Sequence, residues 1–203
     1  MNKIFGSVAL AVLLAAGTAQ AQSPGVHTHD GFYLQMDLGF GWMGSSAEDD
    51  AGTELKFTGG AGQFGVALGA ALTPNFLIGG SFWGTTIPDP TVELDGTDLG
   101  EADATLTLSG FGVHLAYYFT PVNVYLSATP SITQLSLDDG NSSSETEWGF
   151  GMKFAVGKEW WVSDNWAIGL NGQFAFSSNE DKGTGAPTWG TTWFGVAFSA
   201  TYD

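Results

Sequence analysis

From residue 31 onward, large apolar side chains alternate with small or polar ones at every second position. The alternation is clearest in 32–42 and 194–202, where one parity is mostly apolar and the other is mostly small or polar. A period of two is that of a β-strand, because successive strand residues point to opposite faces, whereas a helix repeats about every 3.6 residues. The 30 glycines of the chain also disfavour helices. The pattern therefore predicts an all-β chain.

Eight segments carry the alternation, and the connections between them alternate in length. The eight ranges are 31–42, 55–71, 76–86, 104–119, 122–134, 147–160, 165–177 and 189–202. Tight turns follow the second, fourth and sixth segments at 73–75, 120–121 and 163–165, where proline, asparagine, aspartate and serine supply the turn chemistry. The remaining connections are long and acidic. In an antiparallel meander, all short turns then lie at one end and all long loops at the other, which is the layout of bacterial outer-membrane barrels.

The N-terminal residues have the composition of a secretory signal peptide. Lys3 supplies a positive charge, 8–16 is a short apolar run, and Ala19 and Ala21 place small residues where a signal peptidase reads them. The apolar run is too short to cross the ~30 Å hydrocarbon core of a membrane. We predict Sec-dependent export to the outer membrane of a Gram-negative bacterium. The predicted organisation is a cleaved signal peptide over 1–21, a polar segment over 22–30 and a barrel over 31–203.

Two kinds of barrel share this alternation, since a soluble barrel hides its apolar face inside and a membrane barrel turns it toward lipid. Only 13% of the residues are charged, and the face opposite the apolar one is small and almost uncharged, which makes a poor water-facing surface. We therefore predict an eight-stranded antiparallel up-and-down transmembrane β-barrel, with a soluble ligand-binding barrel as the alternative. The predicted lipid-facing residues are Leu34, Leu38, Phe64, Val66, Leu68, Phe111, Val113, Leu115, Phe154, Val156, Phe194, Val196 and Phe198.

Aromatic residues gather near the ends of the segments, as in the two interfacial girdles of membrane barrels. The predicted girdle consists of Trp42, Trp83, Tyr117, Phe119, Trp148, Trp160, Trp166 and Tyr202. Strands of about 10–11 residues, each rising ~3.3 Å and tilted by ~45°, would cover an apolar band ~25 Å tall.

On these features the chain resembles the small outer-membrane barrels of the OmpA/OmpX type. The resemblance rests on the signal peptide, the eight segments, the alternating connection lengths and the aromatic Tyr202, and it covers essentially all of the chain after the signal peptide. It implies a monomeric barrel in contact with outer-membrane lipid. Asp203 departs from the pattern, because such barrels usually end on the aromatic residue itself.

The parity that faces away from lipid predicts a polar network inside the barrel. Its predicted members are Gln35, Asp37, Gln63, His114, Lys153, Glu159, Asn171 and Gln173. Because isolated charges are costly to bury, we predict that Lys153 pairs with Asp37, with Glu159 as the other candidate. The many inward glycine and alanine residues indicate free volume that water could occupy. Pro130 removes a ladder donor within the fifth segment and predicts a bulge there.

The long loops hold most of the acidic residues. Sixteen of the 21 carboxylates lie in them, namely Glu48, Asp49, Asp50, Glu54, Asp89, Glu93, Asp95, Asp98, Glu101, Asp103, Asp138, Asp139, Glu145, Glu147, Glu180 and Asp181. The net charge of −16 argues against a nucleic-acid partner, whose phosphates need a basic surface. The absence of cysteine excludes a disulfide scaffold, a thiolate metal site and a lipoprotein anchor. No segment has the spacing of a dedicated calcium loop, so we predict no cofactor and no metal.

Histidine offers two further candidate sites. His27, His29 and Asp30 could clasp a metal, but this stretch is better interpreted as a polar linker because no further ligand lies nearby. His114 could serve an acyl-transfer site if a serine lay within reach. The candidate serines are Ser81, Ser109 and Ser127. No motif supports such a site, and we predict no catalytic residue.

These observations leave three functions open. The leading hypothesis is a non-enzymatic surface protein that stabilises the envelope or presents its acidic loops to an extracellular partner. The second is a narrow, cation-preferring pore, because an acidic rim attracts cations. The third is a lipid-modifying membrane enzyme.

Overall fold

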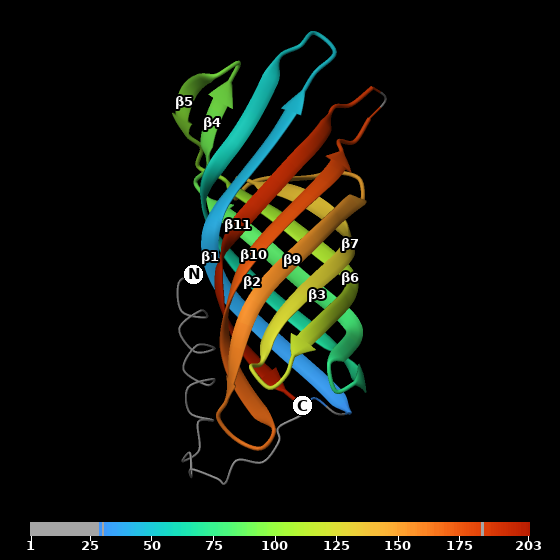
Figure 1. Cartoon of the computed structure of the whole chain (residues 1–203). Helices are drawn as coiled ribbons and strands as arrows, with labels where there is room; N and C mark the ends of the chain where they lie inside the picture. Colours follow the sequence, from blue (N-terminus) through green and yellow to red (C-terminus); the bar gives the residue numbers. More distant parts are fainter. Residues whose placement is uncertain (1–28, 30, 184) are drawn as a thin grey trace.

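Eight long β-strands form the wall of a closed antiparallel barrel in the computed structural model (Figure 1). The structure describes residues 29, 31–183 and 185–203. The predicted signal peptide lies outside the described residues, as does the predicted polar segment apart from His29. Within the described ranges, no helix has the length and apolar character needed to cross a membrane.

The eight strands follow one another around the barrel in chain order. They are β1 (Phe32–Glu48), β2 (Glu54–Thr73), β3 (Phe76–Pro88), β6 (Thr105–Phe119), β7 (Val124–Asp138), β9 (Gly149–Trp161), β10 (Trp166–Glu180) and β11 (Thr188–Tyr202). Three short strands belong to the long connections, namely β4 (Thr91–Leu94), β5 (Thr97–Glu101) and β8 (Ser143–Glu145). β1 pairs with both β2 and β11, and the seam between β1 and β11 closes the barrel. The predicted eight-stranded up-and-down barrel is confirmed.

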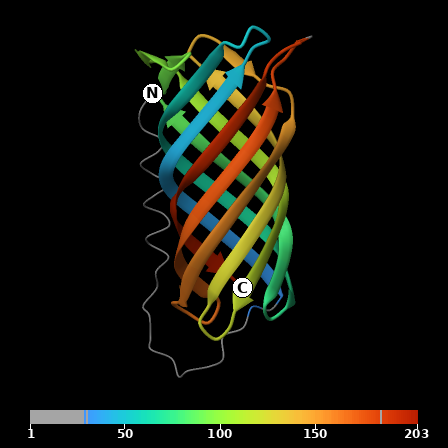
Figure 2. The same cartoon turned by 45° about the horizontal axis from the view of Figure 1, so that its top comes forward.

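The two ends of the barrel differ as the connection lengths predict. The three short turns lie at one end, and the hairpins β1–β2 and β10–β11 rise beyond the wall at the other (Figures 1 and 2). The strands are longer than expected there, since β1 and β2 continue up to the turn 49–53. Asp49 closes that turn, because its Oδ1 accepts hydrogen bonds from the backbone N–H groups of Ala51 and Thr53, both at 2.9 Å. Of the connection expected between the first two segments, 43–48 and Glu54 are therefore strand.

The apolar face of the sheet points outward along the wall. Leu38 and Phe40 are 69% and 72% exposed, whereas Tyr33 and Gln35, which belong to the other parity of the same strand, are buried. Eleven of the thirteen residues predicted to face lipid are exposed, and Leu34 and Leu115 are half-buried. Such a surface is poorly suited to water and well suited to hydrocarbon, because a closed barrel pairs its backbone polar groups between strands.

Trp83 is wrongly predicted as a girdle residue, because it lies inside the barrel. Its side chain is fully buried, and its indole N–H donates to Ser131 Oγ at 3.0 Å. The parity explains the position, since Trp83 alternates with the outward Phe82. Gly110 lies directly across on β6 and leaves room for the ring. The other predicted girdle residues are exposed or partly exposed on the outer surface: Trp42, Tyr117, Phe119, Trp148, Trp160, Trp166 and Tyr202.

Pro130 interrupts the ladder between β6 and β7 without a bulge. Gly112 pairs with Ser131 and Leu115 pairs with Ala128, so the register is the same on both sides of the proline. No extra residue is inserted, and the predicted bulge is wrong. The pairs between these two positions are missing because Pro130 has no N–H to donate.

The expected free volume beside the inward glycines is filled by aromatic rings. A Cβ on Gly110 would lie 2.6–2.8 Å from indole atoms of Trp83, and one on Gly157 would lie 2.6 Å from the Tyr125 ring. A Cβ on Gly195 would likewise lie 2.8 Å from Trp193. These small residues are the surfaces against which large inward rings pack, so the expectation of free volume is wrong at these positions.

This packing makes Gly110 sensitive to substitution. We expect Gly110→Ala to lower the free energy of unfolding by about 1–3 kcal/mol, because the added methyl group overpacks against Trp83. The measurement is urea-induced unfolding in lipid vesicles. Gly62→Ala is the matched control, since a Cβ there meets nothing within 4 Å on the outer face. Equal stability of the two variants would contradict the packing of Trp83 on Gly110.

Candidate functional site

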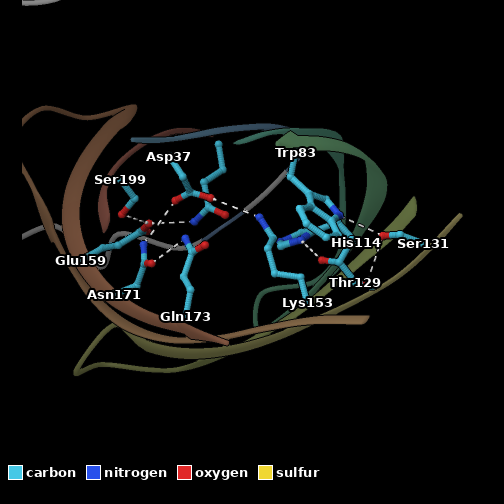
Figure 3. Close-up of polar contacts among 11 residues, drawn as sticks. Asp37, Trp83, His114, Thr129, Ser131, Lys153, Glu159, Asn171, Gln173 and Ser199 are labelled. Carbon is cyan, nitrogen blue, oxygen red and sulfur yellow. Dashed lines mark hydrogen bonds and ion pairs between the residues drawn. The ribbon is translucent and has the colours of Figure 1, made fainter. Parts of the chain in front are cut away.

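The barrel interior is built in three layers, and the middle one carries the candidate site. Toward the long loops lies an apolar plug, formed by Met43, Phe57, Ala61, Trp83, Ile87, Leu106, Leu108, Leu135, Ala175 and Trp193. Toward the short turns lies an aromatic layer, formed by Tyr33, Ala67, Leu77, Ala116, Tyr118 and Tyr125. Between them lies a polar network to which inward residues of several strands contribute (Figure 3). The alternation of the strands delivers one inward residue at every second position and thus sets this layering.

Lys153 on β9 lies beside Asp37 on β1 in the middle of the lumen. Its Nζ is 3.9 Å from Asp37 Oδ2, and the lysine is 4% exposed. Asn171 Nδ2 donates to Asp37 Oδ1 at 3.2 Å, and Gln173 Nε2 donates to Asn171 Oδ1 at 2.8 Å. The structure thus places Lys153 beside the partner expected from the sequence, and Figure 3 shows the chain of contacts from Gln173 to Lys153.

Glu159, the other partner considered for Lys153, lies elsewhere in the network. Its carboxylate is 1% exposed and accepts four hydrogen bonds. The donors are Gln35 Nε2 at 3.2 Å, Ser199 Oγ at 3.3 Å, Thr201 Oγ1 at 2.6 Å and the Tyr118 hydroxyl at 3.2 Å. Four donors satisfy a buried carboxylate without a lysine.

His114 and Gln63 complete the set of residues predicted for the lumen. His114 Nδ1 lies 3.1 Å from Thr129 Oγ1, and Thr129 is directly opposite Lys153 in the sheet register. The histidine therefore contacts a threonine instead of one of the three candidate serines. Gln63 is 2% exposed, and both of its side-chain polar atoms lack a hydrogen-bond partner among the described residues.

Sequence reasoning missed a second polar cluster, at the short-turn end of the lumen. His29 precedes β1 and is 1% exposed, so it is not the polar linker expected from the sequence. Its Nδ1 lies 2.8 Å from Asp203 Oδ1, and its Nε2 lies 3.1 Å from Asn123 Oδ1. Both ring nitrogens are thereby engaged by protein atoms. His27 and Asp30, the other members of the suggested metal clasp, lie outside the described residues.

The surroundings of His29 favour its charged form. Burial lowers the pKa of His29, but the hydrogen bond and the negative charge of Asp203 outweigh it, so the pKa lies above its ordinary value. The departure of Asp203 from the family pattern was the sequence signal that could have indicated this contact.

The acidic residues of the long loops mostly serve their own turns or stand in solvent. Asp139 Oδ1 accepts hydrogen bonds from the backbone N–H groups of Asn141 at 2.9 Å and Ser142 at 2.7 Å, which lowers the pKa of Asp139. Two lysines offset part of the negative charge of these loops. Lys56 lies 3.2 Å from Glu93, and Lys182 lies 3.6 Å from Glu145. Across the described ranges, no three His, Asp or Glu residues gather as a metal site would require.

A closed barrel of eight strands with an apolar outer band and a packed lumen defines the class of small outer-membrane barrel proteins. Residues 7–186 match the family of the outer membrane protein beta-barrel domain, and the chain belongs to this family. It is therefore a protein of the Gram-negative outer membrane. A comparison with curated proteins finds no match.

Solved structures of low sequence identity share the fold. Neisserial surface protein A has 16% identity and a TM-score of 0.56, with 84% of this chain and 96% of that chain covered. Outer membrane protein AlkL, solved in lipid bilayers, has 13% identity and a TM-score of 0.51, with 92% of this chain and 95% of that chain covered. At such identities the similarity concerns the fold alone.

Proposed function

We propose that this chain is a non-enzymatic, monomeric outer-membrane protein that holds acidic hairpins at the cell surface, where they stabilise the envelope or engage an extracellular partner. The observation that carries the proposal is the filled lumen. Buried side chains occupy it from the aromatic layer to the apolar plug. An eight-stranded barrel has an interior just wide enough for such side chains.

The apolar plug argues most directly against a pore. Met43, Trp83, Leu108 and Trp193 are all fully buried within it. An ion crossing this layer would have to shed its water among these large, closely packed side chains, which is strongly unfavourable. The function then lies with the surface that the barrel exposes.

The long hairpins offer that surface on a firm base. β4 pairs with β2, and Asp95 Oδ1 accepts a hydrogen bond from the backbone N–H of Glu54 at 2.9 Å, which ties the β4–β5 hairpin to the wall. The acidic side chains of the long hairpins create a negative electrostatic potential at this end of the molecule. Charge complementarity therefore favours a partner with a basic surface and raises its rate of encounter.

The test is a single-channel recording in a planar bilayer with asymmetric KCl. We expect no discrete current steps from wild-type protein whose insertion has been verified by its heat-dependent shift in gel mobility. The double variant Trp83→Ala/Trp193→Ala is the control, because it empties the plug of its two largest side chains. Cation-selective steps from the wild-type protein would overturn the proposal and favour the narrow pore.

A further inference from the structure

Three distant parts of the chain meet at the short-turn mouth of the barrel. His29 lies before β1, Asn123 lies in the turn between β6 and β7, and Asp203 directly follows β11. Short turns of outer-membrane barrels face the periplasm, so this is the periplasmic mouth. One imidazole ring therefore links the two strands of the closing seam to the opposite wall.

The ring also packs against aromatic side chains at the short-turn end of the lumen. Its centroid lies 3.8 Å from that of the Tyr118 ring and 5.4 Å from a ring of Trp161. The Tyr118 hydroxyl in turn donates to Glu159. His29 is therefore the first member of a contact chain that leads from the short-turn end to the buried carboxylate of the polar network.

Both hydrogen-bond partners of His29 present acceptor atoms to the ring. The Asp203 carboxylate oxygen faces Nδ1, and the Asn123 amide oxygen faces Nε2. An imidazolium donates from both nitrogens, whereas a neutral imidazole donates from one and turns a lone pair toward the other partner. With the Asn123 amide in this orientation, both contacts are hydrogen bonds only when the ring is protonated.

We propose that His29 is a protonation-controlled stopper, which closes the periplasmic mouth of the barrel over Glu159 while its ring is charged and loosens when the ring becomes neutral. The charged and titratable groups that face the ring are Asp203 beyond β11, Tyr118 on β6 and Glu159 on β9. The two carboxylates favour the charged ring.

The direction of the pH dependence follows from this geometry. The pKa of His29 is raised in the folded protein, with burial opposing and Asp203 favouring the charged form. A group with a raised pKa contributes stability below its ordinary pKa and loses it as the pH rises through the raised value. The mouth should therefore be closed at mildly acidic pH and loosen at alkaline pH.

The sequence contains no cysteine, so a single introduced thiol can report on access to the mouth. We choose Ser199→Cys, because Ser199 is fully buried and contacts Glu159. A water-soluble thiol reagent is applied to the inserted protein at about pH 6 and about pH 9, on either side of the ordinary histidine range. Rates are divided by those of Ser144→Cys, an exposed position at the opposite end, which corrects for the pH dependence of the reagent and of an exposed thiol. The pH dependence that remains is compared with that of Ser199→Cys in the Asp203→Asn background, where the thiol has the same surroundings but the stopper lacks its carboxylate.

We expect the corrected rate to rise roughly 5–30-fold between the two pH values, the range expected for loss of one charge-assisted contact. Asp203→Asn and His29→Ala should react fast at both pH values. Asp139→Asn, which removes a carboxylate at the other end, should keep the pH step. A corrected rate that is independent of pH in the wild-type background, or unchanged by Asp203→Asn, would overturn the proposal.

A second measurement needs no cysteine. Urea-induced unfolding of the wild-type barrel should have a lower midpoint at about pH 9 than at about pH 6, and this difference should vanish in Asp203→Asn. An equal difference in both proteins would mean that another group titrates. An unchanged wild-type midpoint would indicate a neutral ring with the Asn123 amide reversed, which contradicts the stopper.

Discussion

Replacing Val196 with arginine should lower the free energy of unfolding by about 2–4 kcal/mol, the cost of a positive charge on the lipid face near the middle of the bilayer. Val196 is 52% exposed on the outer surface, where its register partners are Phe40 and Gly172. Neither of these described partners carries a negative charge that could pair with the guanidinium. The measurement is urea-induced unfolding in lipid vesicles, followed by tryptophan fluorescence.

Ser144→Arg provides the control for charge alone. Ser144 lies on β8 among the exposed residues of the long-loop end, so an arginine there should change stability very little. A loss of less than about 1 kcal/mol for Val196→Arg, which is the value for positions near the interface, would mean that Val196 is not near the bilayer centre.

Replacing Asp37 with leucine should cost about 3–5 kcal/mol, because it leaves the Lys153 ammonium buried without its counter-charge. The lysine cannot turn toward a second carboxylate easily, since Glu159 is already engaged by four donors. The same unfolding measurement applies, with circular dichroism to show that the variant keeps its β-structure.

The double variant Asp37→Leu/Lys153→Met isolates the pair from the burial of either residue. It should recover much of the loss, and the double-mutant cycle should give a coupling of about 0.5–3 kcal/mol. Additive effects of the two substitutions would show that the ions do not stabilise one another across their 3.9 Å separation.

The strands and their faces could be predicted because they depend on local alternation. Leu38 and Asp37 are neighbours in sequence, and the period of two is sufficient to place one outside and the other inside. The same logic brought Asp37 and Lys153 into one lumen, and few basic residues were available to choose from. For Trp83 the two signals disagree, because its residue type is typical of a girdle whereas its parity directs it inward, and the structure follows the parity.

The periplasmic cluster could not be predicted in this way. His29, Asn123 and Asp203 are separated by long stretches of chain, and their contact depends on the register of the whole barrel. Packing of Trp83 on Gly110 depends equally on register, because sequence alone does not say which glycine faces which ring. Periodicity gives the direction of a side chain, but its neighbours come from the pairing of strands.

The seam between β1 and β11 also limits how this protein can assemble. Leu34 pairs with Tyr202, so this seam joins the first strand of the barrel to the final one. Pairings this distant in sequence form slowly, because loop-closure entropy must be overcome first. Until they form, two strand edges and the apolar outer face are open to other chains. During assembly, closure of this seam therefore competes kinetically with aggregation. Faster seam closure should raise the yield of folded protein.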